Sequence, residues 1–231
     1  MAAAVLFDWR ETLVHFEWDE RLLAAGHRAG LAAAGAQFDP AEFTRRFRDE
    51  LLPALRPRGD YAALLQAELG LDRAQADAFL LAEQTVWEPA VALVGGAHAL
   101  LEAVGRLGYV IGVVADHWPE PAPLARREIA RLGVAERVDA IVLSGEVGAE
   151  KPDRRIFAEA LERVGAAPEE CVFVGDDPVA DVRGAGELGM ATVQALWFEA
   201  DPAPAGIEPD FLAFTPADVL DALRLLRPLA P

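Results

Sequence analysis

The feature that most constrains the fold is an alternation of helical segments with short apolar runs from Val91 onward. The predicted helices cover residues 97–107, 124–132, 153–164 and 179–188, and the apolar runs that follow them cover 109–115, 138–143, 171–175 and 191–195. Strands separated by helices of ten or more residues are typical of a doubly wound parallel sheet. Residues 3–7 predict a further buried strand, and residues 211–214 and 217–226 predict an edge strand and a last helix.

The region from residue 18 to about residue 87 has a different character, because it contains helical patterns and no convincing strand. Asp39-Pro40 and Asp72 are helix-start signals. We therefore expect a bundle of about four helices inserted after the first strand. The predicted fold class is α/β, a doubly wound parallel sheet with an inserted helical-bundle cap domain. The core would comprise residues 1–15 and 90–231, and the cap residues 16–89.

Charge and composition limit the possible partners. The 231 residues include 38 acidic and 21 basic side chains, which gives a net charge of -17. Such a surface repels nucleic acid and anionic membranes, so we expect neither as a partner. No apolar run reaches the roughly 18 residues that a membrane span needs. The single cysteine, Cys171, excludes an internal disulfide, and we expect a cytoplasmic protein, a monomer or a homodimer.

Acidic residues stand where the predicted strands end. Asp8, Asp116 and Asp176 each follow a strand, and Asp181 lies five residues after Asp176. In an open α/β sheet, ligands bind beyond the carboxyl ends of the strands. Carboxylates gathered there would repel one another, and a hard divalent cation such as Mg²⁺ would relieve that repulsion.

The chain contains one lysine, Lys151, beside 20 arginines. A lysine carries a compact point charge, whereas an arginine presents a planar fork. Lys151 is therefore either a chance survivor in an arginine-rich chain or a residue at a site where arginine would not serve.

The order of these segments resembles the four motifs of the haloacid dehalogenase superfamily. The first is the run from Asp8 to Thr12, and the second ends in Ala115-Asp116. The third is Lys151-Pro152, and the fourth is Gly175-Asp176-Asp177, with Asp181 after it. Each motif alone is weak, but together, in this order and at strand ends, they are specific. The resemblance covers nearly the whole chain, including the place and size of the helical insert.

The resemblance implies a nucleophile and a metal site. Asp8 would attack the substrate and form an aspartyl intermediate. Its other oxygen, the backbone carbonyl of Arg10 and the carboxylate of Asp176 would bind Mg²⁺.

The resemblance also implies a role for the lysine. Lys151 would neutralise the charge on Asp8 and on the transferring group. Asp181 would orient Lys151 or a metal-bound water, with Asp177 nearby.

Two motif positions depart from the family pattern. Phosphatase members carry an aspartate where this chain has Arg10, and they use it as general acid and base. Arginine stays protonated, so it cannot take that role. It could instead bind a phosphate or carboxylate bidentately, or point away into a surface pair with Glu11. Dehalogenase and phosphonatase members also lack this aspartate, but as a rule they do not carry arginine there.

The second departure is Ala115, where the family normally has a serine or threonine that binds a substrate oxygen. Losing such a hydrogen bond costs roughly 1.5–3 kcal/mol. We expect the substrate to contact Arg10, Ala115, Asp116 and Lys151. His15 and His117 flank the motif loops, so either could be a substitute proton donor or a surface or packing residue.

These residues support three hypotheses. The first is a Mg²⁺-dependent phosphatase that hydrolyses a small phosphorylated metabolite through Asp8. The second is a catalytically silent binding or regulatory protein, which the changes at Arg10 and Ala115 would favour. The third is a 2-haloacid dehalogenase-like hydrolase, in which Arg10 would bind the substrate carboxylate and no metal is needed.

Overall fold

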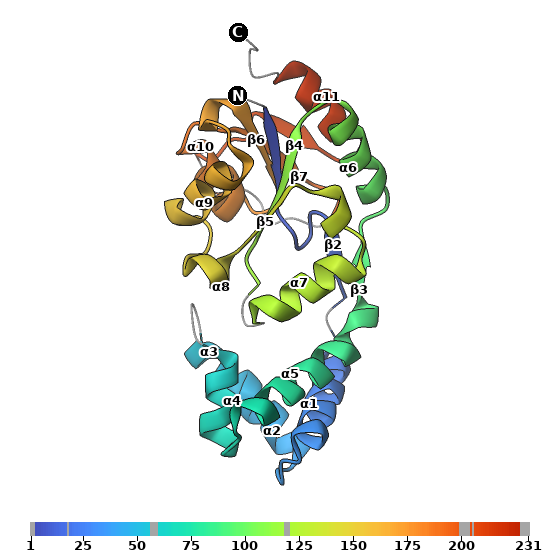
Figure 1. Ribbon diagram of the computed structural model, residues 1–231, viewed down its shortest axis with the longest axis vertical. Helices are drawn as coiled ribbons and strands as arrows, with labels where there is room; N and C mark the ends of the chain where they lie inside the picture. Colours follow the sequence, from blue (N-terminus) through green and yellow to red (C-terminus); the bar gives the residue numbers. More distant parts are fainter. Residues whose placement is uncertain are drawn as a thin grey trace. The chain divides into compact units, whose positions relative to one another are not determined.

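The computed structural model describes residues 3–17, 19–55, 60–117, 121–198, 204 and 206–226. The chain divides into two compact units (Figure 1). The α/β unit comprises Met1–His15, Leu93–Asp116 and Ile129–Pro231, and the helical unit comprises Phe16–Ala92 and His117–Glu128. None of the helices in these described ranges is both long enough and apolar enough to cross a membrane.

The α/β unit is built on a six-stranded sheet with the order β5-β4-β1-β6-β7-β8. The strands are β1 (Ala4–Phe7), β4 (Val110–Ala115), β5 (Ala140–Leu143), β6 (Cys171–Gly175), β7 (Ala191–Ala195) and β8 (Phe211–Ala213). All neighbouring strands pair in parallel. The predicted parallel α/β fold is therefore confirmed, and β8 lies at the edge of the sheet.

Helices cover both faces of this sheet, as Figure 1 shows. The helices of the α/β unit are α6 (Ala97–Arg106), α8 (Ser144–Val147), α9 (Arg154–Val164), α10 (Gly184–Gly186) and α11 (Asp218–Leu225), and α7 (Ala122–Arg131) runs from the helical unit into it. Helices α9 and α10 lie on one face, and α6 and α11 on the other. The central strands β1, β4 and β6 are buried on both sides, which explains why they read as continuous apolar runs.

The helix predicted at 179–188 is present as a π-helix (Pro178–Arg183) followed by the three-residue α10. Glycines at both ends of α10 favour a break in the regular helix. A two-stranded ladder of β2 (Val14–Phe16) and β3 (Val91–Leu93), together with α8, was not expected. These elements have three or four residues, too few to show a period in the sequence.

The helical unit contains α1 (Glu20–Ala34), α2 (Pro40–Arg46), a π-helix (Phe47–Leu51), α3 (Leu52–Leu55), α4 (Tyr61–Leu69) and α5 (Arg73–Trp87). Asp39 and Asp72 cap α2 and α5 through their side chains, as their positions in the sequence indicate. Helix α1 packs on α5, and Gly30 lies against the ring of Phe79.

Candidate active site

Asp8 follows β1, the strand that pairs with both β4 and β6. Its backbone N–H donates to the carbonyl of Val174 at 2.8 Å, so the main chain at Asp8 stays in register with β6. Because the strands are parallel, the residues that follow β1, β4 and β6 lie together beyond the carboxyl ends of the strands. Asp8 is buried there, with 6% of its surface exposed.

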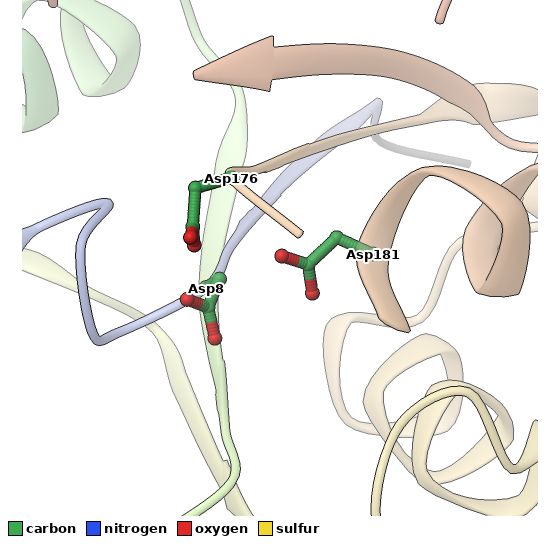
Figure 2. A group of neighbouring side chains, drawn as sticks. All are labelled: Asp8, Asp176 and Asp181. Carbon is green, nitrogen blue, oxygen red and sulfur yellow. The ribbon is translucent and has the colours of Figure 1, made fainter. Parts of the chain in front are cut away.

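Three carboxylates converge in this region (Figure 2). Asp8, Asp176 and Asp181 each place one oxygen within 4.8 Å of the others. Asp8 and Asp181 are buried and Asp176 is partly buried. Carboxylates this close repel one another unless a cation lies among them.

Lys151 supplies a positive charge inside this cluster. Its Nζ donates to Oδ1 of Asp8 and, at 2.6 Å, to Oδ1 of Asp181. Burial alone would lower the pKa of Lys151, but the charges of Asp181 and Asp8 outweigh burial and raise that pKa well above its usual value. The lysine is therefore a permanent cation that joins Asp8 to Asp181. One ammonium against three carboxylates still leaves the cluster acidic.

Asp181 is fixed from a second side. Its Oδ2 accepts a hydrogen bond from the backbone N–H of Asp177 at 3.1 Å. A Cβ atom on Gly175 would lie only 2.3 Å from that same oxygen, so the close approach requires glycine. The side chain of Asp177 caps the π-helix by accepting from the backbone N–H groups of Val179 and Ala180. Asp177 therefore holds the start of the helix that carries Asp181.

Asp176 is held by Thr12 and Gln194, neither of which was predicted as a site residue. Thr12 Oγ1 donates to Oδ1 of Asp176 at 3.2 Å, and Gln194 Nε2 donates to the carbonyl oxygen of Asp176, also at 3.2 Å. Both side chains are buried. Their polar groups among apolar neighbours are the signal that could have identified them. Burial, with the charge of Asp8 adding to it, raises the pKa of Asp176 to about 7.

The end of β4 supplies Ala115 and Asp116. Ala115 is buried and offers no hydroxyl group. Oδ1 of Asp116 accepts a hydrogen bond from the backbone N–H of Lys151 at 3.2 Å. Burial raises the pKa of Asp116 to about 6, although the charge of Lys151 opposes that shift. Asp116 thus connects the end of β4 to the segment that carries the lysine.

The loop after Asp8 turns back tightly on itself. The carbonyl of Trp9 accepts from the N–H groups of Leu13 and Val14, and Arg10 pairs with Val14 in an isolated bridge. Arg10 is partly buried. This turn keeps residue 10 beside the strand that follows it.

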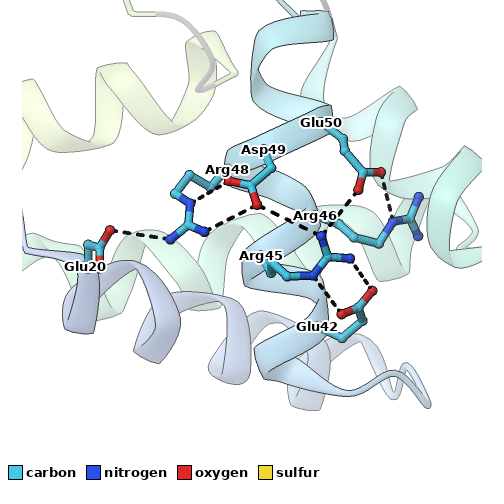
Figure 3. A network of polar contacts seen from close by, with 7 residues as sticks. All are labelled: Glu20, Glu42, Arg45, Arg46, Arg48, Asp49 and Glu50. Atoms are coloured by element: carbon cyan, nitrogen blue, oxygen red, sulfur yellow. Dashed lines mark hydrogen bonds and ion pairs between the residues drawn. The ribbon is translucent and has the colours of Figure 1, made fainter.

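One further candidate, His117, and a group of arginines lie in the helical unit. His117 is buried there. Figure 3 shows the arginines of α2 and the following π-helix in contact with carboxylates: Arg45 with Glu42 at 2.7 Å, and Arg48 with Asp49 at 2.7 Å. This arrangement is typical of a solvated helix face.

A sequence model of haloacid dehalogenase-like hydrolases matches residues 2–189. The chain belongs to this family. Among curated relatives, it is 31% identical over 207 residues to a ribulose-1,5-bisphosphate 5-phosphatase of Halopiger xanaduensis, and the alignment covers 84% of each chain. It is also 39% identical over 102 residues to a glyceraldehyde 3-phosphate phosphatase of Methanopyrus kandleri, which covers 43% of this chain and 44% of that one.

A third relative, a phosphoserine phosphatase of Thermus thermophilus, is 39% identical over 103 residues, which cover 45% of this chain and 39% of that protein. The chain thus spans less than half the length of these last two relatives. Among solved structures, a HAD phosphatase from Thermococcus onnurineus has a TM-score of 0.69 at 23% identity, covering 96% of this chain and 97% of that one. A 2-haloacid dehalogenase from Pseudomonas syringae has a TM-score of 0.66 at 23% identity, covering 97% and 99%. These likenesses show the shared fold.

In a haloacid dehalogenase-like hydrolase, the three-carboxylate cluster fits a divalent cation. All three donors are oxygens, the kind of ligand that Mg²⁺ prefers. The raised pKa of Asp176, which burial and the charge of Asp8 cause, indicates that Lys151 alone does not neutralise the cluster. A cation would lower the cost of keeping Asp8 and Asp176 ionised together.

Proposed function

We propose that this protein is a phosphatase that hydrolyses a small phosphate ester through Asp8. The observation that carries the proposal is the contact of Lys151 Nζ with both Asp8 and Asp181 in a buried acidic cluster. Such a lysine keeps Asp8 ionised and adds positive charge where a phosphoryl group would bind. The three curated relatives described above are all phosphatases, which supports the same reaction class.

In this reaction, an oxygen of Asp8 attacks phosphorus, and the bond from phosphorus to the ester oxygen breaks. A proton must reach that leaving oxygen. Water then attacks the phosphorus of the aspartyl phosphate, which releases inorganic phosphate and regenerates Asp8. Lys151 stays bound to Asp8 and Asp181, which limits movement of the nucleophile and offsets the charge of the incoming phosphoryl group.

Asp8, Asp176 and the backbone carbonyl of Arg10 would hold Mg²⁺. When bound, the ion would neutralise phosphoryl oxygens and the remaining charge of the cluster. Thr12 and Gln194 would keep Asp176 in place for this purpose, since one holds its carboxylate and the other its carbonyl.

Arg10 would bind the phosphoryl group. Ala115 removes a hydroxyl that other members use, and the guanidinium of Arg10 could supply hydrogen bonds in its place. On this proposal, Arg10→Asp lowers activity and raises KM. If Arg10→Asp combined with Ala115→Ser instead exceeds the wild type, Arg10 is a defect and not a substrate ligand.

The direct test is a screen of phosphate esters with and without Mg²⁺, using Asp8→Asn as the inactive control. We expect phosphate release that needs both Mg²⁺ and Asp8. Inertness of the folded, metal-bound wild type toward every ester would favour the silent binding protein. Metal-independent halide release from 2-haloacids would identify a dehalogenase.

A further inference from the structure

We propose that His15, held by Glu11, is the catalytic acid and base of this site. It would take the role of the aspartate that phosphatase members of the family carry at the position of Arg10. This inference rests on the proposed phosphatase function. It is carried by the contacts of His15 in the α/β unit, which contains both His15 and the acidic cluster.

The carboxylates of Asp181, Asp177 and Asp116 already accept hydrogen bonds from other groups. Asp181 accepts from Lys151 and from the backbone of Asp177. The carboxylate of Asp177 caps the π-helix, and that of Asp116 accepts from the backbone of Lys151. A group that gives up and regains a proton in each cycle has to come from elsewhere, and imidazole is the side chain best suited to this near neutral pH.

Glu11 has an unusual backbone that brings it to His15. Its φ is 57°, and it is the one non-glycine residue with positive φ in the described ranges. A side chain in this conformation carries strain, and such residues cluster at functional sites. The turn is closed by the N–H of Glu11 donating to the carbonyl of Val14 at 2.6 Å. As a result, Oε2 of Glu11 lies 2.6 Å from Nδ1 of His15.

His15 lies in β2, outside the six-stranded sheet, and contacts the segment that follows β7. Its ring stacks on Phe198 with centroids 4.4 Å apart and an interplanar angle of 16°. Phe198 comes three residues after the end of β7, and Gln194 on β7 donates to the carbonyl of Asp176. On the other side, Val14 pairs with Arg10, two residues beyond Asp8. Two separate segments thus connect His15 to the site.

The contacts leave one ring nitrogen for chemistry. The carboxylate of Glu11 holds Nδ1, which fixes the ring and its tautomer. Within the described part of the chain, Nε2 makes no hydrogen bond, and 39% of the side chain is exposed. A carboxylate, an oriented histidine and an accessible Nε2 form the arrangement that proton transfer requires.

The proposed cycle balances as follows. Protonated His15 gives its Nε2 proton to the ester oxygen while the Asp8–phosphorus bond forms and the ester bond breaks. Neutral His15 then takes a proton from the water that attacks the aspartyl phosphate. Phosphate leaves, Asp8 is regenerated, and His15 is again protonated. Glu11 is a positioning residue, because it acts only through His15.

The experiment compares His15→Ala with wild type on an alkyl phosphate and on nitrophenyl phosphate, in Mg²⁺. Loss of acid and base catalysis should lower turnover of the alkyl ester about 10²- to 10⁴-fold. Nitrophenolate leaves without a proton, so His15→Ala should still give a burst of about one equivalent and then stall. Added imidazole should restore turnover. Glu11→Gln should lower turnover of the alkyl ester more than that of the nitrophenyl ester, with KM little changed.

His98→Ala is the matched control, since His98 contacts a backbone carbonyl at Leu132 and should leave turnover unchanged. Wild-type rates in His15→Ala would overturn the inference. So would an equal loss on both esters, burst included, that imidazole does not restore, because this would indicate a structural role. An inert wild type would overturn the proposed function itself, whereas an active wild type with an unaffected His15→Ala variant would overturn this inference alone.

Discussion

The lysine carries the positive charge of the site. Lys151 contacts Asp8 and Asp181 from a buried position, and the ring of Phe173 lies 5.7 Å from its Nζ. Lys151→Arg would bring a wider, planar guanidinium into a buried site that holds an ammonium, so we expect phosphatase activity to fall at least about 100-fold with the fold retained. Lys151→Met should also lose activity, and it should lower the free energy of unfolding by about 3–5 kcal/mol because it breaks a buried pair.

Activity assays and urea unfolding would check both variants. Arg155→Lys is the control, since its exposed pair with Asp153 contributes little. Wild-type turnover in Lys151→Arg would contradict the assignment.

A second prediction at this scale concerns pH. Burial and the charge of Asp8 raise the pKa of Asp176 from 3.8 to about 7. Between these values the folded protein keeps a proton that the unfolded chain has released, so stability falls as pH rises through this window. Asp176→Asn cannot titrate. With a chelator present, the free energy of unfolding of Asp176→Asn should therefore rise relative to that of the wild type by about 2–4 kcal/mol between pH 4 and pH 7.5.

Urea unfolding at several pH values would measure this difference. The difference in free energy of unfolding between the two proteins could instead be the same at every pH, or change in favour of the wild type as pH rises. Either result would show that Asp176 is already ionised in the folded, metal-free protein.

Only part of the candidate site could be predicted from the sequence. Asp8, Asp176 and Asp181 could be grouped from sequence because parallel strands end at one edge. Thr12 and Gln194 stand out in the sequence only as polar residues among apolar neighbours. Their contacts with Asp176 depend on side-chain direction between distant segments, which the sequence does not show. The Glu11–His15 contact depends on a positive φ, which the sequence does not signal, since glutamate rarely adopts it.

At the scale of elements, replacing either of two helical glycines by alanine compares the cost of close packing with the gain in helix propensity. A Cβ on Gly30 in α1 would lie 2.8 Å from the ring of Phe79, whereas a Cβ on Gly105 in α6 would meet Ile111 at an ordinary 3.8 Å. Gly30→Ala should therefore destabilise the protein by about 1–3 kcal/mol. Gly105→Ala should stabilise it by about 0.5 kcal/mol, because alanine favours a helix. Urea unfolding distinguishes the two signs, and stabilisation by Gly30→Ala would contradict the packing of α1 on α5.

The elements themselves were largely predictable where the sequence has a long period. The predicted spans of β6 and β7 coincide with the structure, and α9 (Arg154–Val164) begins one residue after the predicted helix at 153–164. The helix predicted at 179–188 is present, but most of it is a π-helix, because hydrophobic spacing does not distinguish an α-helix from a π-helix. The ladder of β2 and β3 pairs two short segments more than 70 residues apart, and such non-local pairing leaves no local signal.

At the scale of the whole molecule, the net charge of -17 and a specific cation site both affect stability, and their effects have to be distinguished. Self-repulsion of so many carboxylates destabilises the folded state, and salt screens it. Sodium chloride should therefore raise Tm in the wild type and in Asp176→Asn alike. A bound ion acts differently, because it stabilises only a folded state that can bind it.

The last prediction uses this difference. At constant ionic strength, Mg²⁺ at 100 times its Kd should stabilise the wild type by about 2.7 kcal/mol. For a chain of this size, that is a rise in Tm of about 5–10 °C. Asp176→Asn, which lacks one of the three carboxylates, should show a much smaller rise in Mg²⁺ and the same rise in sodium chloride. Thermal unfolding followed by circular dichroism, with calorimetric titration for Kd, would measure both. Equal Mg²⁺ shifts in the two proteins would mean that the ion only screens surface charge, and the acidic cluster would then not be a metal site.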